Sequence, residues 1–296
     1  MEFRPFRIPL TTRFRGVTER SGVLVRGSGP DGAEAWGEYS PFPDYTPERA
    51  SRWWAAAMEA ARGDWPAPVH ASVEVNSIVP EVAPDAAPAH ALANGCRTAK
   101  VKVGGRDSSL ADDVARVAAV ARALGPGGKV RVDANGAWDV DVAQRALREL
   151  DAAVRDAGLG GLEYAEQPCA SVEELATLRR RTPVPIAADE SVRIPGDVDD
   201  VLRLDAADIV VLKAAPLGGV RACLELAERA ARPVVVSSAM ESSVGLAAGL
   251  ALALALPEQT HAHGLGTGAL LAADTVARPL IPRDGRLSPQ PLEVMA

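Results

Sequence analysis

TAKVKVGG (residues 98–105), LADDVARVAAVARAL (110–124) and KVRVDANG (129–136) follow one another along the chain and decide its fold. The first and third segments are short and strand-like, whereas the second is rich in Ala, Leu and Arg and is typical of a helix. A helical segment between two strands indicates that the strands are parallel, because parallel neighbours need a long crossover connection. Together the three segments predict a βαβ unit.

The same alternation extends over most of the chain. It gives eight strand candidates, at residues 71–79, 98–105, 129–136, 162–168, 185–191, 209–215, 233–240 and 261–266, with further helical stretches such as 141–157 between them. Successive polar landmarks at the strand ends, from Lys102 to Ser237, lie 23 to 33 residues apart, which is the length of one βα unit. Eight such units in the α/β class favour a closed (β/α)8-type barrel, a modified TIM barrel, over an open sheet.

The N-terminal region has a different pattern. SGVLVRG (21–27) and AEAWGEYS (33–40) flank the turn-rich GSGPDG and predict a β-hairpin. A helix follows, which Thr46 is suited to cap and Pro47 to begin. These elements predict a small α+β unit before the barrel.

A Pro-rich stretch, GDWPAPVH (63–70), marks the boundary between the two patterns. The C-terminal stretch after about residue 275 is also Pro-rich and is suited to return and pack on the N-terminal unit. We therefore expect a capping domain over residues 1–69, joined by the segment 275–296, and a barrel catalytic domain over residues 70–274.

The composition limits the class of protein. Of the 296 residues, 47% are hydrophobic and 24% are charged, as in ordinary globular proteins. The longest apolar stretch, residues 244–257, is too short to span a bilayer and predicts a buried helix. The net charge of −7 argues against general nucleic-acid binding. Three cysteines, with no apolar signal segment at the start, indicate a cytoplasmic protein without a disulfide framework, and no pattern indicates an oligomeric state.

Charged residues stand where the predicted barrel strands end. Lys100 and Lys102 lie on the same face of their strand. Each of the next four strands also carries a polar residue after its apolar run, just before a turn: Asp133 and Asn135, Glu166, Asp189 and Glu190, and Lys213. In a barrel this end of the strands is the catalytic rim. A lone charge there is more often a solvated strand end, but this combination in this order favours a functional site.

The set has a common chemistry. Carboxylates from three successive strands, Asp133, Glu166 and Asp189, are oxygen ligands of the kind that favours Mg²⁺, or Mn²⁺ as a substitute. A partly desolvated lysine beside a cation has a lowered pKa and can act as a base near neutral pH. The residues therefore predict proton abstraction next to a carboxylate, with the metal stabilising the enediolate. Glu163 lies on the opposite strand face from Glu166 and is interpreted as structural.

The motifs AKVKVGG, DANGAW, EQP, ADES and VLKAAPLGG resemble those of the muconate-lactonising-enzyme-like branch of the enolase superfamily, in the same order. The resemblance implies that Lys102 is the proton-abstracting base and that Lys100 adjusts its charge. It implies that Lys213 lies across the substrate, either as a second acid/base or as a cation over the ring. It also implies that the three carboxylates bind the metal and that Asn135 and Glu190 support them.

Further segments narrow the resemblance. FRG (14–16), WGEYSPFPDYT (36–46) and SSAMESSVGLA (237–247) are similar to those of o-succinylbenzoate synthases, notably the short actinobacterial members. This subgroup implies a syn dehydration of 2-succinyl-6-hydroxy-2,4-cyclohexadiene-1-carboxylate, in menaquinone biosynthesis. The N-terminal region is shorter than the capping domain usual in the superfamily, which leaves open how fully a lid covers the substrate.

Substrate contacts are predicted from three further places. The first 26 residues carry six arginines against two glutamates, and Arg15 is the preferred contact for a dicarboxylate, although solvated strand faces also explain such arginines. The segment 237–243 predicts a helix N-terminus whose N–H groups bind a carboxylate, or simple capping by Ser237 or Ser238. Gly264 predicts exposed N–H groups at the rim, or a tight turn. His261 and His263 are interpreted as structural.

Two other functions remain open at this point. A racemase of N-acylamino acids or an epimerase of dipeptides would use Lys102 and Lys213 as paired bases on the same scaffold. A barrel kept as a non-catalytic binding protein belongs to a different class, and the intact set of lysines and carboxylates speaks against it.

Overall fold

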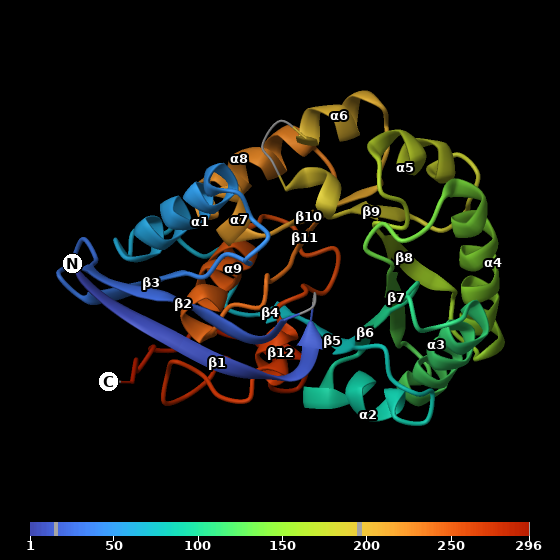
Figure 1. Cartoon of the computed structure of the whole chain (residues 1–296), viewed down its shortest axis with the longest axis horizontal. Coiled ribbons are helices and arrows are strands. Elements are labelled where there is room, and N and C mark those ends of the chain that lie inside the picture. The colour runs from blue at the N-terminus through green and yellow to red at the C-terminus, as the bar shows by residue number, and fades with distance from the viewer. Residues whose placement is uncertain (15–16, 194–196, 296) are drawn as a thin grey trace.

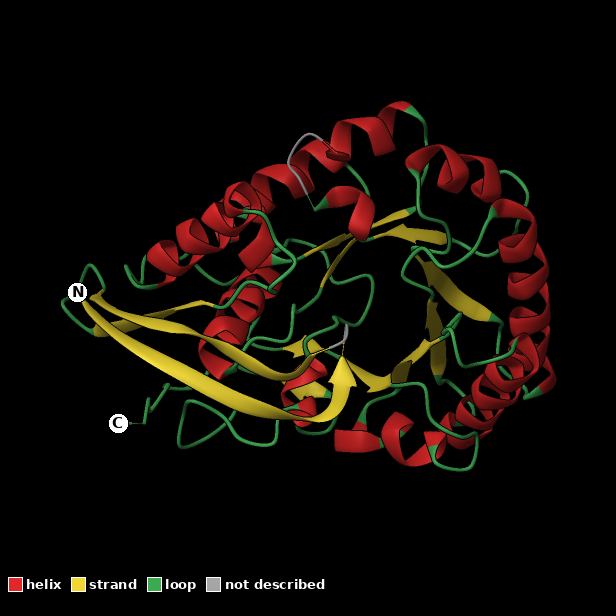
Figure 2. Ribbon diagram, viewed as in Figure 1, coloured by secondary structure: helices red, strands yellow, loops and turns green. Residues whose placement is uncertain are grey.

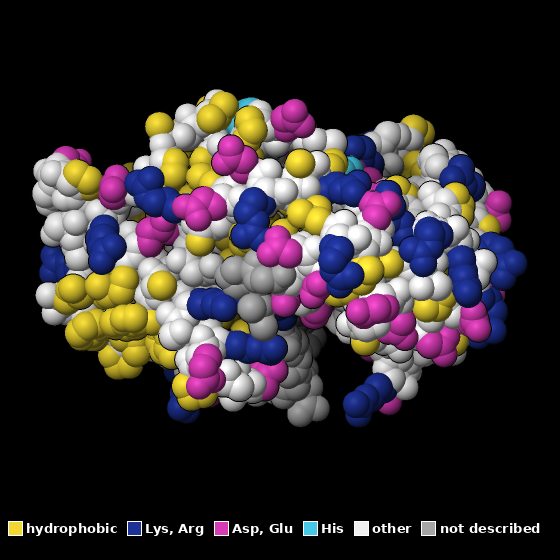
Figure 3. Space-filling view, turned by 90° about the horizontal axis from the view of Figure 1, so that it is seen from above, with side chains coloured by type: hydrophobic (Ala, Val, Ile, Leu, Met, Phe, Trp, Pro, Cys, Tyr) yellow, Lys and Arg dark blue, Asp and Glu magenta, His cyan; other side chains and the backbone are white. Residues whose placement is uncertain are grey.

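The computed structural model describes residues 1–14, 17–193 and 197–295, with side chains except those of residues 12–14. It consists of a capping unit beside a barrel, and both chain termini lie at the capping end (Figure 1). Acidic and basic side chains are interspersed over the face seen in Figure 3. No helix of the described part of the chain has both the length and the apolar character that a bilayer crossing requires.

The capping unit is a three-stranded antiparallel sheet with one helix packed on it. Strands β1 (Glu2–Phe14), β2 (Val17–Ser28) and β3 (Glu34–Tyr39) lie in that order, and the pairing of β2 with β3 confirms the predicted hairpin. Helix α1 (Pro47–Ala60) begins after Thr46, whose side chain accepts the N–H of Arg49. Gly37 permits the close packing of α1, because a Cβ there would lie 1.9 Å from the carbonyl oxygen of Ala57. Strand β1 was not predicted.

The barrel is built on seven parallel strands in sequential order. They are β5 (Asn76–Val79), β6 (Thr98–Lys102), β7 (Lys129–Asp133), β8 (Leu162–Glu166), β9 (Ile186–Ala188), β10 (Ile209–Leu212) and β11 (Val234–Val236). The sheet curls into a ring with helices on its outside (Figure 2). These helices are α2 (Ala87–Ala91), α3 (Leu110–Leu124), α4 (Val140–Asp156), α5 (Val172–Arg179), α6 (Asp197–Arg203), α7 (Ala214–Leu217), α8 (Val220–Ala230) and α9 (Ser243–Ala255). The fold is therefore a (β/α)8-type barrel with a small α+β cap.

The eighth predicted strand is not a regular strand, and this prediction was wrong in detail. Residues 261–266 make only two isolated parallel bridges, Val75 with His263 and Ser237 with Gly264. The N–H of His263 donates to Glu74 at 2.7 Å, and the N–H of Gly264 donates to Val236 at 2.8 Å. The irregular segment thus occupies the eighth position and closes the ring between β11 and the first strands.

Buried apolar clusters form the core of the barrel and join the cap to it. Most of the barrel's apolar side chains lie between the sheet and its helices, and the very apolar helix α9 is part of this core, as predicted. A second cluster joins Ile8, Phe42 and Trp53 of the cap to Met240 and Leu270 of the barrel. Because this cluster is shared, the cap is docked above the carboxyl ends of the strands by hydrophobic burial.

The C-terminal segment contacts both units. Strand β12 (Arg286–Leu287) pairs antiparallel with β4 (Val73–Glu74), at the start of the barrel. Further on, Leu292 and Val294 pack against a cluster that contains Trp36 of the cap. The last residues therefore bridge from the barrel to the cap.

Candidate active site

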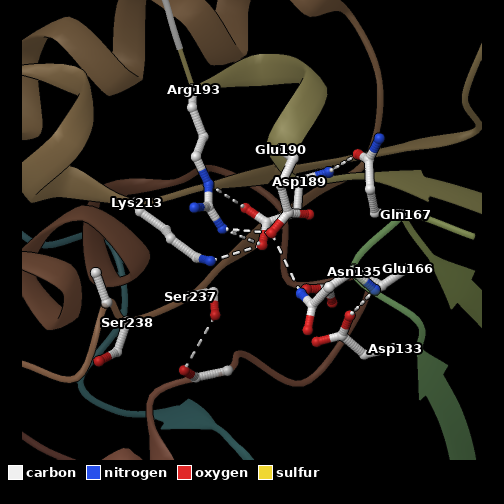
Figure 4. Close-up of polar contacts among 12 residues, drawn as sticks. Asp133, Asn135, Glu166, Gln167, Asp189, Glu190, Arg193, Lys213, Ser237 and Ser238 are labelled. Carbon is white, nitrogen blue, oxygen red and sulfur yellow. Dashed lines mark hydrogen bonds and ion pairs between the residues drawn. The ribbon is translucent and has the colours of Figure 1, made fainter. Parts of the chain in front are cut away.

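Strand register brings three of the predicted site residues side by side. Lys102 pairs with Asp133 across β6 and β7, and Asp133 pairs with Glu166 across β7 and β8. Glu166 in turn pairs with Ala187 of β9, two residues before Asp189. Lys213 directly follows β10. Since parallel strands in register end at one rim, all these side chains reach the same end of the barrel; Figure 4 shows most of them.

Lys100 joins two of the carboxylates. Its Nζ lies 2.7 Å from Oε1 of Glu166 and 3.2 Å from Oδ2 of Asp133. Burial by itself lowers the pKa of Lys100, but the charges of Glu166 and Asp133 outweigh it and raise this pKa well above its usual value. In this arrangement Lys100 is a fixed positive charge between two acids.

Asp189 is held by two cations. Its Oδ2 accepts from Nζ of Lys213 at 2.6 Å and from Nη2 of Arg193 at 2.9 Å. Burial favours the neutral acid, but Arg193 and Lys213 outweigh it, so the pKa of Asp189 lies far below its usual range. The carboxylate of Asp189 is therefore ionised although its side chain is only 2% exposed.

Glu166 has the opposite shift. Burial is the largest cause, and the neighbouring charges of Asp133 and Asp189 add to it against the opposing effect of Lys100, raising the pKa of Glu166 to about 7. Carboxylates placed this close in a buried site repel one another unless further positive charge is supplied. The three acids therefore form a site that gains by binding a cation.

Lys102 is the most accessible lysine of the group. Its side chain is 29% exposed, against 13% for Lys100 and 10% for Lys213. Its Nζ lies 3.9 Å from Oδ1 of Asp133, whereas the other two lysines make contacts of 2.7 Å and 2.6 Å with carboxylates. Of the three amines, Lys102 is the one best placed to meet a substrate.

Asn135 and Glu190 connect the two aspartates. The backbone N–H of Asn135 donates to Oδ1 of Asp133 at 3.0 Å, and its side-chain amide donates to Oε1 of Glu190 at 3.2 Å. The same Glu190 oxygen accepts from Arg193 at 2.8 Å. Contacts therefore run from Asp133 to Asp189 around the rim (Figure 4).

Sequence reasoning missed Gln167 and Arg193. The buried Gln167 accepts the N–H of Asp189 at 3.0 Å and donates to Ser191 at 2.7 Å, so it holds the backbone at the end of β9. It directly follows Glu166 in the EQP motif, which is the signal that could have pointed to it. Arg193 stands four residues after Asp189, a spacing at which side chains on one turn meet.

The carboxylates fit a divalent metal ion by chemistry and by strand position. Oxygen donors alone are the set that hard cations prefer. In the structure the acids point at lysine and arginine nitrogens, and among residues 1–14, 17–193 and 197–295 no three His, Cys, Asp or Glu side chains converge closely enough to hold an ion. A metal ion held by these acids would therefore have to share their oxygens with the nitrogens of Lys100, Lys213 and Arg193.

The segment 237–243 corrects both predictions made for it. Helix α9 begins at Ser243 with Ser242 as its N-cap, so neither Ser237 nor Ser238 caps it. The N–H groups along the segment are used by the protein itself: Ser237 donates to Leu212, Ser238 to Gly264, Ala239 to Glu241, Met240 to Ser238, Ser242 to Glu38 and Ser243 to Asp274. The helix N-terminus therefore receives protein carboxylates. The hydroxyl group of Ser238 is also used, because it donates to Glu241 at 2.6 Å and accepts from Thr267 at 2.7 Å. The hydroxyl group of Ser237, 3.5 Å from the carbonyl oxygen of Gly264, remains as a candidate contact (Figure 4).

Gly264 is also used internally. Its N–H donates to Val236 and its carbonyl accepts from Ser238, so the predicted exposed N–H group at the rim is absent there. A Cβ at this position would lie 2.7 Å from Oγ of Ser237, which explains the glycine by close approach. Arg15 lies outside the described residues. Among the other N-terminal arginines, Arg4, Arg7 and Arg26 form exposed ion pairs, as solvated strand faces would.

Glu163 and the two histidines lie away from the rim. A bulge in β8 makes Glu163 the extra residue between the pairs Val130–Leu162 and Arg131–Tyr164. Its carboxylate binds Arg131 at 2.5 Å and His261 at 3.0 Å, one layer below Asp133. His263 is buried between Val236 and Gln259. These residues support the barrel, in agreement with the structural interpretation.

Family models match both units of the chain. The model described as enolase C-terminal domain-like matches residues 84–291, and the model described as enolase N-terminal domain-like matches residues 6–61. A relative from Thermobifida fusca, an o-succinylbenzoate synthase, is 56% identical over 294 residues, which cover 99% of this chain and 89% of the relative.

The chain belongs to the o-succinylbenzoate synthases of the enolase superfamily. It is accordingly an enzyme, a carbon–oxygen lyase, and the enzymes of this superfamily generally use a divalent metal ion. A second synthase of this family, from Mycolicibacterium smegmatis, is 50% identical over 286 residues, covering 96% of this chain and 84% of the relative.

Known structures agree on the architecture. L-Ala-D/L-Glu epimerase from Bacillus subtilis superposes with a TM-score of 0.82 at 25% identity, covering 99% of this chain and 96% of the epimerase. Muconate cycloisomerase from Pseudomonas fluorescens gives a TM-score of 0.79 at 25% identity, with 99% and 94% covered. This synthase therefore shares its barrel and cap with epimerases and cycloisomerases.

Proposed function

We propose that the chain catalyses the Mg²⁺-dependent syn dehydration of 2-succinyl-6-hydroxy-2,4-cyclohexadiene-1-carboxylate to 2-succinylbenzoate, a step of menaquinone biosynthesis. Mn²⁺ is a possible substitute for Mg²⁺. The observation that carries the proposal is the row of side chains at one rim, in which Lys102, Asp133 and Glu166 are paired across adjacent strands. The identity to synthases over nearly the whole chain supports the same reaction.

The proposed metal ligands are Asp133, Glu166 and Asp189. A bound Mg²⁺ supplies positive charge beside the substrate carboxylate and so stabilises the second negative charge that develops when the α-proton leaves. Lys102, the most exposed of the three amines, takes that proton. The protonated Lys102 then returns this proton to the hydroxyl group, which leaves as water while the ring becomes aromatic, so one lysine suffices for both steps in the syn geometry.

The other lysines have supporting roles in this proposal. Lys100 holds Asp133 and Glu166 and adjusts the charge around Lys102. Lys213 lies beside Asp189, at the other end of the row of carboxylates from Lys102. When its ammonium group turns from Asp189 to the substrate, its positive charge stabilises the ring. Asn135 and Glu190 orient the ligands, and Ser237 offers its hydroxyl group to the succinyl chain.

Charge balance favours a dianionic substrate. Four acids (Asp133, Glu166, Asp189, Glu190) and four bases (Lys100, Lys102, Arg193, Lys213) meet at the rim, so their formal charges cancel. A divalent cation adds two positive charges, and a dicarboxylate adds two negative charges. Either ligand bound alone would leave the site with a net charge of two, whereas both bound together keep it neutral, which favours their joint binding.

The proposal also assigns a role to the capping unit and a role to the barrel. Residues 1–69, with 275–296, form the cap over the substrate, and residues 70–274 form the catalytic barrel. The cysteines at positions 96, 169 and 223 are free and buried, which fits a cytoplasmic enzyme. The partner is a small carboxylate rather than a macromolecule.

The decisive experiment is a direct assay of 2-succinylbenzoate formation with and without metal. We expect turnover to disappear after chelation, and to return when Mg²⁺ is added. Turnover that survives exhaustive chelation would exclude the proposed metal-assisted step.

Racemisation of N-acylamino acids or epimerisation of dipeptides is the second candidate, because Lys102 and Lys213 flank the carboxylates as a two-base mechanism requires. Exchange in D₂O separates the two activities. A racemase exchanges the α-proton of both enantiomers of an N-succinylamino acid, whereas a dedicated synthase dehydrates the cyclohexadiene rapidly and exchanges those compounds poorly.

A further inference from the structure

Arg193 makes several polar contacts at the rim, although the proposed reaction gives it no role. Its Nη2 donates to Oδ2 of Asp189 at 2.9 Å and to Oε1 of Glu190 at 2.8 Å, and its Nε lies 3.4 Å from Oδ1 of Asp189. Arg193 thus contacts both oxygens of one carboxylate and one oxygen of the next. The planar guanidinium can make these contacts simultaneously, which the single ammonium of a lysine cannot do.

These contacts limit how Asp189 can turn. A carboxylate has about four lone-pair sites for partners. Lys213 and Arg193 take two sites on Oδ2, and Nε of Arg193 takes one on Oδ1. The backbone of Asp189 is fixed separately by Gln167. If Lys213 turns to the substrate, Arg193 still determines the plane of the carboxylate and leaves oxygen sites open for an ion.

Arg193 is itself anchored in the cap. Its Nη1 donates to the hydroxyl of Tyr45 at 3.4 Å. The Tyr45 ring stacks on Phe42 and meets Trp53 edge to face, and both belong to the cluster shared by cap and barrel. A cavity of about 280 Å³ lies between Tyr45 and Arg52 of the cap and Glu190 and Arg193 of the rim. Arg193 therefore connects Tyr45, which packs in the core of the cap, to Asp189 at the rim by hydrogen bonds.

We propose that Arg193 is a positioning residue that orients the Asp189 carboxylate for the metal ion and couples that orientation to the docked cap through Tyr45. This inference rests on the proposed function, because it takes Asp189 as a metal ligand. Arg193 touches neither the substrate nor the ion in this role. It acts through Asp189 and Glu190.

The test is direct Mn²⁺ binding to the full-length protein, measured by electron paramagnetic resonance of the free ion. We expect Arg193→Met to raise the Mn²⁺ dissociation constant by about 10- to 100-fold, the usual effect of removing a group that holds a metal ligand. Arg193→Lys keeps the positive charge but cannot make the several contacts of the planar guanidinium, so we expect an intermediate dissociation constant. The Mg²⁺ concentration for half-maximal turnover rises in parallel, while kcat at saturating Mg²⁺ falls less.

Arg203→Met is the matched control. Arg203 forms an exposed ion pair with Asp200 on α6, away from the rim, and its loss leaves Mn²⁺ affinity unchanged. Thermal unfolding of each variant shows whether it has folded. If Arg193→Met does not fold, Arg193→Lys alone decides: an affinity equal to that of the wild type overturns the proposal.

A double-mutant cycle tests the link to the cap. Tyr45→Phe removes one hydroxyl and is expected to weaken Mn²⁺ binding less than Arg193→Met does. Because Tyr45 acts through Arg193, the double variant is expected to bind no more weakly than Arg193→Met alone. Additive losses would show that Tyr45 acts independently and would overturn the coupling.

Asp189→Asn separates this inference from the proposed function. If Asp189→Asn loses Mn²⁺ binding while Arg193→Met keeps the wild-type affinity, only the role of Arg193 is wrong. If wild type and Asp189→Asn bind Mn²⁺ equally, the proposed metal site itself is wrong.

Discussion

At the residue scale, the rim combines buried acids with cations of different accessibility. Lys100 and Lys213 are committed to carboxylates at 2.7 Å and 2.6 Å, whereas Lys102 is more exposed and lies 3.9 Å from Asp133. A base must reach the proton that it abstracts, so the best candidate is the amine that makes no close contact with a carboxylate. Position along the strands and accessibility therefore lead to the same lysine.

We expect Lys102→Ala to lower turnover by about 10²- to 10⁴-fold, the usual contribution of a general base. The fold is expected to remain intact, because this side chain is partly exposed and contributes little packing. Steady-state kinetics on the cyclohexadiene substrate and a thermal melt measure the two effects. Lys129→Ala is the control, since Lys129 pairs with Glu163 at the other end of the sheet. Near-normal activity of Lys102→Ala would refute its assignment as the base.

At the element scale, the irregular segment after α9 replaces a regular eighth strand. Its backbone closes the ring, and the side chain of His263 adds two further bonds. Nδ1 of His263 accepts the N–H of Val236 at 3.0 Å, and the other ring nitrogen faces Oε1 of Gln259 at 2.9 Å. This pattern requires a neutral ring with its proton on Nε2. Burial, together with the charge of Arg131, lowers the pKa of His263 to about 3.

Acid should therefore weaken the closure of the barrel. Between about pH 3 and pH 6.5 the unfolded chain binds a proton at His263 and the folded chain does not, so this residue lowers the free energy of unfolding as pH falls. The slope is at most about 1.4 kcal/mol per pH unit for one group. Urea unfolding of wild type and His263→Gln at several pH values between 5 and 7 measures it. The variant should show a shallower slope, whereas His90→Gln on α2 should match the wild type.

At the scale of the whole molecule, a buried carboxylate attaches the cap to the barrel. Glu38 of β3 accepts the N–H groups of Ser242 and Gly245 at 3.1 Å and 3.0 Å, at the start of α9. The hydroxyl groups of Ser242 and Ser40 donate to the same side chain. Burial raises the pKa of Glu38, and these hydrogen bonds oppose that shift. A cap carboxylate thus fills the helix N-terminus that was predicted to bind the substrate.

Removing this contact should loosen the cap. We expect Glu38→Ala to lower the free energy of unfolding by about 2–4 kcal/mol, because it leaves buried N–H groups without an acceptor. Urea denaturation followed by tryptophan fluorescence measures the change. The control is Glu34→Gln in the same strand, whose exposed ion pair with Arg26 contributes less than about 1 kcal/mol. An equal, small effect of both substitutions would show that Glu38 does not attach the cap.

The sequence by itself determined the barrel, the rim and the lysine–carboxylate set. Strand alternation and the length of a βα unit are local properties of the chain, so Lys102, Asp133 and Glu166 can be placed on one rim without coordinates. The same local rule placed Thr46 at the start of α1, and it identified α9 as buried.

Only the tertiary structure decided which polar groups meet across long stretches of chain. Glu38 and Ser242 are 204 residues apart, and nothing near either residue predicts their contact. The bulge at Glu163 and the irregular eighth segment likewise depend on neighbouring strands. The physical reason is that backbone periodicity is set by each segment alone, whereas the partner of a buried charge depends on how the cap and barrel dock.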